Sequence, residues 1–219
     1  MKVNTDGVLL GAMAASENPL RILDIGTGTG VIALMLAQRF PRATVDALEI
    51  DAMAAATANR NFGNSAFAGR IVGYATALGD FDTDKPYDLV VSNPPYFLHS
   101  LKNQDVRKQV ARHADRSFFS QLLDRADRWL TAEGSLQLVL PIPVAAQVVA
   151  DAVGSYGMAV QWMTDIRSFA LHPPIRRIVA LGRSPGGRSY TQHDFVIYAS
   201  KGVYSQVYRD LLKDFFLAF

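Results

Sequence analysis

The chain has 219 residues, of which 49% are hydrophobic, so it is long enough to bury a core and too apolar to be disordered throughout. It contains no cysteine, which excludes disulfides, thiolate metal sites and cysteine nucleophiles and fits a reducing compartment. No apolar run approaches the roughly 20 residues that span a bilayer, and the start of the chain lacks the apolar core of a signal peptide. We therefore expect one cytoplasmic domain over residues 1–219.

The formal net charge is only +2, but it is unevenly distributed. Residues 1–97 carry 7 basic and 10 acidic side chains, whereas residues 98–219 carry 15 and 10. Arginine supplies 16 of the 22 basic residues, and its planar guanidinium suits phosphate recognition and base stacking. This asymmetry permits nucleic-acid binding without proving it.

The first predicted strand, residues 21–25, runs directly into a glycine loop that contains Gly26, Gly28 and Gly30. An apolar helix over residues 31–39 follows. Strand, glycine loop and helix together are typical of a nucleotide-binding unit, because glycines let the backbone approach the ligand and helix-end amides face it. The glycine spacing differs from the G-x-G-x-x-G fingerprint of dinucleotide sites, which disfavours a dinucleotide dehydrogenase.

A second strand is predicted over residues 44–48, and it ends at Glu49. This carboxylate lies 19 residues after Gly30, near the offset of about 20 residues at which an acid meets the ribose of a bound nucleotide. Asp51 is the expected N-cap of an alanine-rich helix that runs to Asn61. We predict a ribose contact for Glu49 and a cap for Asp51; the alternative for both is a solvated loop acid.

Two further strands are predicted over residues 70–74 and 89–91, and the second leads into an Asn-Pro-Pro-Tyr run at residues 93–96. The two prolines stiffen that loop, although Asn-Pro is also an ordinary turn signal. In an open α/β sheet, ligands bind beyond the carboxyl ends of the strands at the switch in strand order. Strands one and four flank that switch, so the glycine loop and the Asn-Pro-Pro-Tyr loop should face each other across one crevice.

The start of the chain and the segments after residue 97 carry weaker patterns. A polar turn at the start predicts a short helix toward Ala15, with Thr5 or Asp6 as its cap. Residues 98–115 are polar and basic, and we predict a mobile flap beside the site, with an ordinary solvated loop as the alternative. The remaining predicted helices cover residues 117–130, 145–156 and 203–219. The remaining predicted strands cover residues 135–140, 160–166, 177–182 and 195–199, with the second and third as an antiparallel edge pair.

One stretch of the second half is free of acidic residues. Between Asp165 and Asp194 it contains only basic charges, namely Arg167, Arg176, Arg177, Arg183 and Arg188. Such a stretch beside the sheet edge is the best candidate for a phosphate-contacting surface.

The motifs together resemble a known family. The run Asp-Ile-Gly-Thr-Gly-Thr-Gly at residues 24–30 resembles the first motif of class I S-adenosylmethionine-dependent methyltransferases. Asn-Pro-Pro-Tyr is similar to the hallmark of the members that methylate exocyclic or amide nitrogens. The opening residues 1–11 and the later Ala111-Arg112-His113 resemble bacterial enzymes that methylate N6 of adenine 37 in valine tRNA. This resemblance implies a Rossmann-like α/β fold with a doubly wound, mostly parallel, seven-stranded sheet, S-adenosylmethionine as cofactor and tRNA as partner.

The resemblance assigns expected roles residue by residue. The cofactor is expected to contact Thr5, Asp24, Gly26, Thr27, Gly28, Gly30, Glu49 and Asn93. The expected catalytic residues are Asn93, Pro94 and Tyr96. The expected substrate-binding residues are Pro95, Tyr96, Phe97, Arg112, Arg176 and Arg177. No cluster has the spacing of a metal site, so no metal is expected.

The chemistry of an adenine amino group fits these residues. Its nitrogen is a poor nucleophile, because the lone pair is delocalised into the ring. If the Asn93 side-chain oxygen and the Pro94 carbonyl each accept one N–H, they hold the nitrogen in the pyramidal geometry that frees the lone pair. Tyr96 is expected to stack on the extruded base, which is worth roughly 1–3 kcal/mol. Transfer then requires mainly proximity and orientation, without a strong general base.

Two departures from the family pattern are visible. Ala77 stands where many of these enzymes carry an acid that contacts the cofactor's adenine, so Asp80 or a backbone group is expected to substitute. Family members usually carry a short segment upstream of the opening motif, whereas here Met1 directly precedes it, which predicts a less well covered cofactor pocket.

Three alternatives stay open. A glutamine N5-methyltransferase of a release factor shares the Asn-Pro-Pro-Tyr motif but carries a helical domain ahead of the glycine loop, where only 23 residues precede Asp24 here. A guanine N2-methyltransferase of ribosomal RNA often has Phe in place of Tyr96. A non-catalytic RNA-binding protein with a decayed fold is favoured by Ala77 and opposed by the intact glycines.

Overall fold

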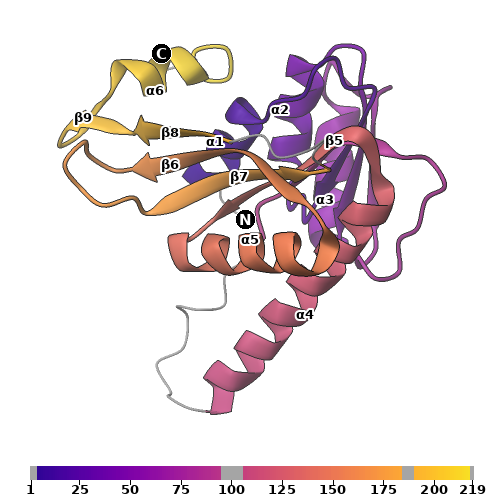
Figure 1. The fold of residues 1–219 in the computed structure, drawn as a ribbon. Coiled ribbons are helices and arrows are strands. Elements are labelled where there is room, and N and C mark those ends of the chain that lie inside the picture. The colour runs from indigo at the N-terminus through magenta and orange to yellow at the C-terminus, as the bar shows by residue number, and fades with distance from the viewer. Residues whose placement is uncertain (1–3, 95–105, 184–189, 218–219) are drawn as a thin grey trace.

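A central sheet with helices on both faces forms the body of the protein (Figure 1). The computed structural model describes residues 4–94, 106–183 and 190–217, and for residues 106–115 the backbone alone. The helices are α1 (Thr5–Met13), α2 (Val31–Arg39), α3 (Ala52–Gly63), α4 (Val106–Trp129), α5 (Ile142–Tyr156) and α6 (Gln206–Leu212). The strands are β1 (Arg21–Ile25), β2 (Thr44–Glu49), β3 (Ile71–Ala75), β4 (Tyr87–Ser92), β5 (Leu130–Leu140), β6 (Ala159–Arg167), β7 (Arg176–Gly182), β8 (Thr191–Val196), β9 (Tyr198–Ser200) and β10 (Val203–Tyr204).

The main sheet has the strand order β3-β2-β1-β4-β5-β7-β6-β8, and every neighbouring pair is parallel except those that involve β7. The predicted doubly wound, mostly parallel sheet is confirmed, but the prediction of seven strands was wrong by one. Strand β8 pairs with β6 and takes the edge, so β6 and β7 are not an edge pair. The first four residues of β8 are exposed, and its sequence therefore lacks the apolar alternation that identifies a strand.

Successive apolar side chains of the buried strands point to opposite faces of the sheet, and they form two hydrophobic clusters, one on each face. In β1, Ile22 faces the cluster that α1, α2, α3 and α6 cover, whereas Leu23 faces the cluster beneath α4 and α5. Both side chains are fully buried. Successive side chains of a strand point to opposite faces, so one short strand anchors both helical layers.

Two predicted elements have different bounds in the structure. The helix predicted over residues 117–130 begins earlier, because the backbone from Val106 onward already belongs to α4; the run from Val106 to Trp129 contains neither Gly nor Pro, which favours helix. In Figure 1 this helix extends away from the body of the molecule. Residues 98–105 lie outside the described residues, and a mobile flap beside the site stays a prediction. At the other end, Val203 and Tyr204 pair with β9, and the last helix begins only after the cap Ser205.

The predicted cap of α3 is confirmed, whereas that of α1 was wrong. The Asp51 side chain accepts a hydrogen bond from the Ala54 amide at 2.8 Å. In α1 the cap is Asn4 rather than Thr5 or Asp6, and its Oδ1 accepts from the Gly7 amide at 2.7 Å. Within the described ranges, no helix is both long and apolar enough to cross a bilayer.

Candidate functional site

The two loops predicted to form the site begin side by side at the carboxyl ends of β1 and β4. Asp24 lies opposite Val91 and Ile25 opposite Ser92 in this parallel pair. The Ser92 hydroxyl donates a hydrogen bond to the Ile25 carbonyl at 2.8 Å and ties the two strand ends together. The glycine loop and Asn93 therefore leave the sheet from adjacent positions, as the strand-order argument predicted.

The three glycines of this loop have backbone conformations that other residue types rarely adopt. Gly26, Gly28 and Gly30 have φ values of 74°, 60° and 91°, all in the left-handed region. A Cβ added at Gly26 would meet no atom within 4 Å, so the space above this residue is open. The amides of Gly26 and Thr27 both donate to the Leu48 carbonyl at 2.9 Å, which holds the loop against the end of β2.

Gly30 has no room for a side chain, which gives a first testable prediction. A Cβ at this position would collide with the ring of Phe62 on α3, and the positive φ adds backbone strain. We expect Gly30→Ala to lower the free energy of unfolding by about 1–3 kcal/mol, measured by urea denaturation. Gly63→Ala is the control, because a Cβ there meets nothing within 4 Å. Equal stability of the two variants would contradict the prediction.

Glu49 presents its carboxylate to the glycine loop. Its Oε2 accepts from the Gly28 amide at 2.8 Å, and its Oε1 accepts from the Asp51 amide at 2.9 Å. These two bonds fix the carboxylate at the end of β2 beside the loop. A ribose contact for Glu49 stays a prediction.

Asp24 is a buried acid with an unfilled hydrogen-bonding position. It is 0% exposed, and its Oδ2 accepts from the Thr27 hydroxyl at 2.6 Å. Among the described residues, its Oδ1 has no hydrogen-bond partner. Burial raises the pKa of Asp24 to about 7, although the hydrogen bond from Thr27 and the nearby Ala33 amide oppose that rise. A buried acceptor without a donor is costly, so this position suits a ligand that carries a cationic N–H group.

The side chain of Asn93 lies against the beginning of α1. Its Nδ2 donates to the Asn4 Oδ1 at 3.3 Å, and Pro94 behind it is buried. Thr5, a predicted cofactor contact, is exposed in the first turn of the same helix. Asn4 was missed at the sequence level, because no local motif reveals a contact between residues 89 positions apart.

The predicted substrate-binding residues are placed only in part. Pro95, Tyr96 and Phe97 lie outside the described residues, as does the side chain of Arg112 on α4. Arg176 and Arg177 are described, and both form ion pairs.

Those two arginines join elements of the fold. Arg176 Nε lies 2.8 Å from an Asp6 oxygen, which links β7 to α1. Arg177 contacts both oxygens of Asp165 on β6, at 2.6 and 2.9 Å, and this bond raises the pKa of Arg177. A phosphate would have to compete with these carboxylates, and a substrate contact for either arginine stays a prediction.

The expected substitutes for the missing acid lie in one turn. Asp80 is exposed, and its amide donates to the Ala77 carbonyl at 3.1 Å. The Phe81 amide donates to the same carbonyl at 3.2 Å, so this turn is held by its own backbone. A contact between the cofactor's adenine and either Asp80 or the backbone of this turn stays a prediction.

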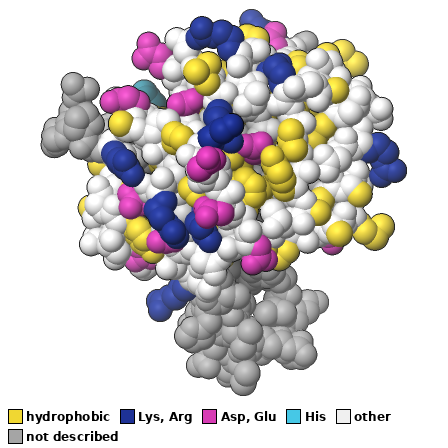
Figure 2. All heavy atoms as spheres, turned by 90° about the vertical axis from the view of Figure 1, so that its right-hand side faces the viewer, with side chains coloured by type: hydrophobic (Ala, Val, Ile, Leu, Met, Phe, Trp, Pro, Cys, Tyr) yellow, Lys and Arg dark blue, Asp and Glu magenta, His cyan; other side chains and the backbone are white. Residues whose placement is uncertain are grey.

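Two further observations concern metal binding and the distribution of charge on the surface. No group of three or more potential metal ligands occurs among the described residues. Figure 2 shows one face of the molecule, on which basic and acidic side chains are interspersed without a continuous basic area in its described part. The described part of this face therefore shows no extended positive surface.

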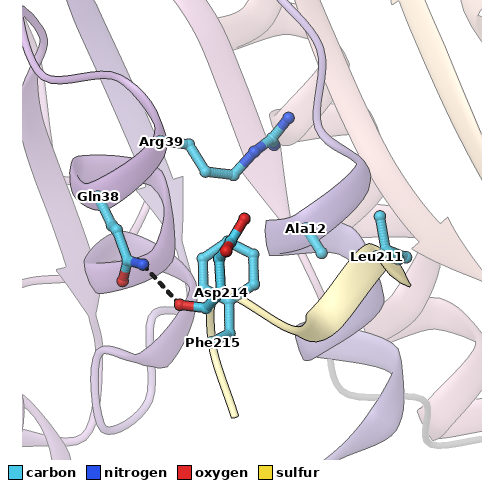
Figure 3. Close-up of a pocket in the computed structure, with 6 residues that line it drawn as sticks. All are labelled: Ala12, Gln38, Arg39, Leu211, Asp214 and Phe215. Atoms are coloured by element: carbon cyan, nitrogen blue, oxygen red, sulfur yellow. Dashed lines mark hydrogen bonds between the residues drawn. The ribbon is translucent and has the colours of Figure 1, made fainter. Parts of the chain in front are cut away.

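A separate pocket of about 430 Å³ lies between α1, α2 and the segment after α6 (Figure 3). Its lining residues are Ala12, Gln38, Arg39, Leu211, Asp214 and Phe215. Gln38 Nε2 donates to the Asp214 carbonyl at 2.7 Å, and Arg39 donates to the Gly11 and Ala14 carbonyls near the end of α1. None of the predicted site residues lines this pocket, and its polar side chains hold neighbouring segments together.

Solved structures that share this fold include methyltransferases. A predicted O-methyltransferase from Agrobacterium tumefaciens superposes with a TM-score of 0.71 at 21% identity, covering 95% of this chain and 96% of that one. A glycopeptide N-methyltransferase complexed with S-adenosylmethionine has a TM-score of 0.59 at 15% identity, covering 84% of this chain and 100% of that one. At these identities the likeness shows the Rossmann-like fold of class I methyltransferases.

Sequence comparison is more specific. A model of the methyltransferase small domain family matches residues 5–160. A protein from Pedobacter heparinus named tRNA1(Val) (adenine(37)-N6)-methyltransferase is 51% identical over 219 residues, which cover 100% of this chain and 92% of the relative. A protein of the same name from Parabacteroides distasonis is 40% identical, covering 99% and 91%. The chain therefore belongs to the methyltransferase small domain family and, within it, to the tRNA1(Val) (adenine(37)-N6)-methyltransferases.

Proposed function

We propose that this protein is a cytoplasmic enzyme that transfers a methyl group from S-adenosylmethionine to N6 of an adenine in tRNA, namely adenine 37 of valine tRNA. The observation that carries the proposal is the placement of Asn93 and Pro94 at the end of β4, directly beside the glycine loop that follows β1. The names of the relatives support the choice of tRNA and of the adenine.

The residues beside the glycine loop fit S-adenosylmethionine. The methionine part of this cofactor carries an ammonium group, which would supply the donor that Asp24 Oδ1 lacks among the described residues. The open space above Gly26 allows close approach to the backbone. Glu49, held at the end of β2 by two backbone amides, is the residue we assign to the ribose hydroxyls. Thr5 and Thr27 are assigned to the same cofactor.

When bound, the cofactor supplies an electrophilic methyl group on a sulfonium. The task of Asn93 and Pro94 is to hold the amino nitrogen of the base in line with it. The Asn93 Oδ1 and the Pro94 carbonyl each accept one N–H, which draws the lone pair out of the ring. The cofactor would supply the methyl group, and the Asn93 Oδ1 and the Pro94 carbonyl would hold the nitrogen while it gained that group and then released a proton to solvent. Tyr96 is proposed to stack on the base.

A tRNA substrate also agrees with the charge distribution. Residues 98–219 carry 15 basic and 10 acidic side chains, opposite in balance to the first part of the chain. Helix α4, which carries Arg112, extends from the body of the molecule in Figure 1. A basic projecting element would give phosphate contacts outside the site, which are screened by salt.

The test is to incubate unmodified total tRNA, ribosomal RNA and a release factor, each separately, with isotopically labelled S-adenosylmethionine and to map the labelled nucleosides or amino acids by mass spectrometry. We expect N6-methyladenosine in one tRNA, at position 37. Label in N2-methylguanosine of ribosomal RNA, or in a glutamine of a release factor, would favour the corresponding alternative enzyme. A separate titration with the cofactor tests for a decayed site, since a non-catalytic relative would show no saturable binding.

A further inference from the structure

Asn4 contacts the end of β4 as well as its own helix. Its Oδ1 accepts one hydrogen bond from the Gly7 amide at 2.7 Å and a second from Asn93 Nδ2 at 3.3 Å. The first bond is the ordinary cap of α1. The second joins residues 89 positions apart, and a helix cap does not require it.

We propose that Asn4 is a positioning residue for methyl transfer, because it determines which end of the Asn93 amide faces the substrate. A primary amide has an acceptor oxygen at one end and a donor NH₂ at the other, and a half-turn exchanges them. Toward Asn93, Asn4 presents an acceptor. The NH₂ end of Asn93 therefore turns toward Asn4, and its oxygen is directed away, as capture of a substrate amino group requires. This inference rests on the proposed function.

The acceptor that Asn4 presents is itself fixed. Rotating the Asn4 amide by a half-turn would place its NH₂ group against the Gly7 amide, so that two donors would face each other and the cap would be lost. The cap of α1 thus sets the orientation of Asn4, and Asn4 sets the orientation of Asn93. The bond from the Gly7 amide thus orients the Asn4 side chain, and the bond from Asn93 to Asn4 in turn orients the Asn93 side chain.

Packing and charge hold this arrangement in place. A Cβ added at Gly7 would lie 3.0 Å from Asn4 Oδ1 and 3.3 Å from Asn93 Nδ2, so the asparagine pair packs directly on the helix backbone. The adjacent Asp6 forms its ion pair with Arg176 on β7 at 2.8 Å. The first turn of α1 is therefore attached to the sheet at two points, to the end of β4 through Asn4 and to β7 through Asp6, and the acceptor is preorganised.

The test compares three substitutions that separate capping from positioning. Asn4→Asp keeps an acceptor for both bonds. Asn4→Ser keeps a cap oxygen on a side chain one carbon shorter, which is expected to lengthen the contact with Asn93, and Asn4→Ala loses both contacts. We expect Asn4→Ser to lower kcat on tRNA about tenfold, as loss of an outer partner of a functional group typically does, with unchanged KM for tRNA, cofactor Kd and Tm. Asn4→Asp should keep kcat near the wild-type value, whereas Asn4→Ala should lower both kcat and Tm.

The outcomes separate this role from a structural one. A wild-type kcat for Asn4→Ser would overturn the positioning role and leave Asn4 as a cap only. A kcat that follows Tm through all three variants would overturn it as well. A wild-type protein that binds the cofactor but methylates no tRNA would overturn the proposed function, and the role of Asn4 in it.

Discussion

Asn93→Ala is expected to lower kcat for tRNA methylation by about 10²–10³-fold, while the Kd for S-adenosylmethionine changes little. Removing one preorganised hydrogen-bonding group that acts on the reacting atoms typically costs that much. The backbone of this segment should persist, because Ser92 still donates to the Ile25 carbonyl and Pro94 stays buried. Single-turnover kinetics with labelled cofactor and isothermal titration measure the two quantities.

The matched control for this variant is Asn64→Ala, which removes an exposed asparagine side chain at the end of α3. It should leave turnover, cofactor Kd and Tm unchanged. An Asn93→Ala protein with near-normal turnover would refute the assigned mechanism. A variant that lost cofactor binding in parallel with turnover would instead show that Asn93 mainly supports the cofactor.

Asp24→Asn is expected to weaken S-adenosylmethionine binding by about 100-fold, yet to stabilise the ligand-free protein above neutral pH. The amide keeps an acceptor for the Thr27 hydroxyl but cannot pair with an ammonium group. In the wild type, a buried carboxylate without a second partner is costly once it ionises.

The pH dependence follows from the raised pKa. Unfolded Asp24 ionises near its ordinary value of 3.8, whereas the folded group holds its proton until about pH 7. Between these values the folded state binds more protons, so the wild-type protein loses stability as pH rises, by up to about 4 kcal/mol from this group. The advantage of Asp24→Asn should therefore grow from pH 4 to pH 7 and stay constant above it. Denaturation of both proteins across this range is the measurement, and a pH-independent difference would contradict the assigned pKa.

Local patterns carried most of the information on the first half of the sheet. β1 and β4 are almost wholly buried and β2 is buried over much of its length, and each strand ends at or leads into a residue type with a recognisable role, namely glycine, Glu49 or Asn93. Such strands can be read from composition because helices cover both faces of a parallel sheet. Their order followed from the connectivity of doubly wound sheets, and the pairing of β1 with β4 confirmed it.

Several features that the sequence did not reveal depend on contacts between residues distant in sequence, whereas the substrate role of the arginines stays a prediction. Strand β8 is polar where it is exposed, and only its pairing with β6 makes it a strand. The stretch rich in arginine suggested a phosphate surface, but Arg176 and Arg177 have carboxylate partners 170 and 12 residues away. No local pattern reveals such partners, since opposite charges can pair across any separation.

The ion pair between Asp6 and Arg176 has a consequence for the order in which the protein matures on the ribosome. Its two side chains are separated by 170 positions, so the contact cannot form until β7 has left the exit tunnel. The nucleotide-binding unit of β1, α2 and β2 is complete more than a hundred residues earlier. Contacts of such separation are formed late, because the chain must first close a long loop. The nascent chain should therefore reach full turnover only after synthesis has passed β7.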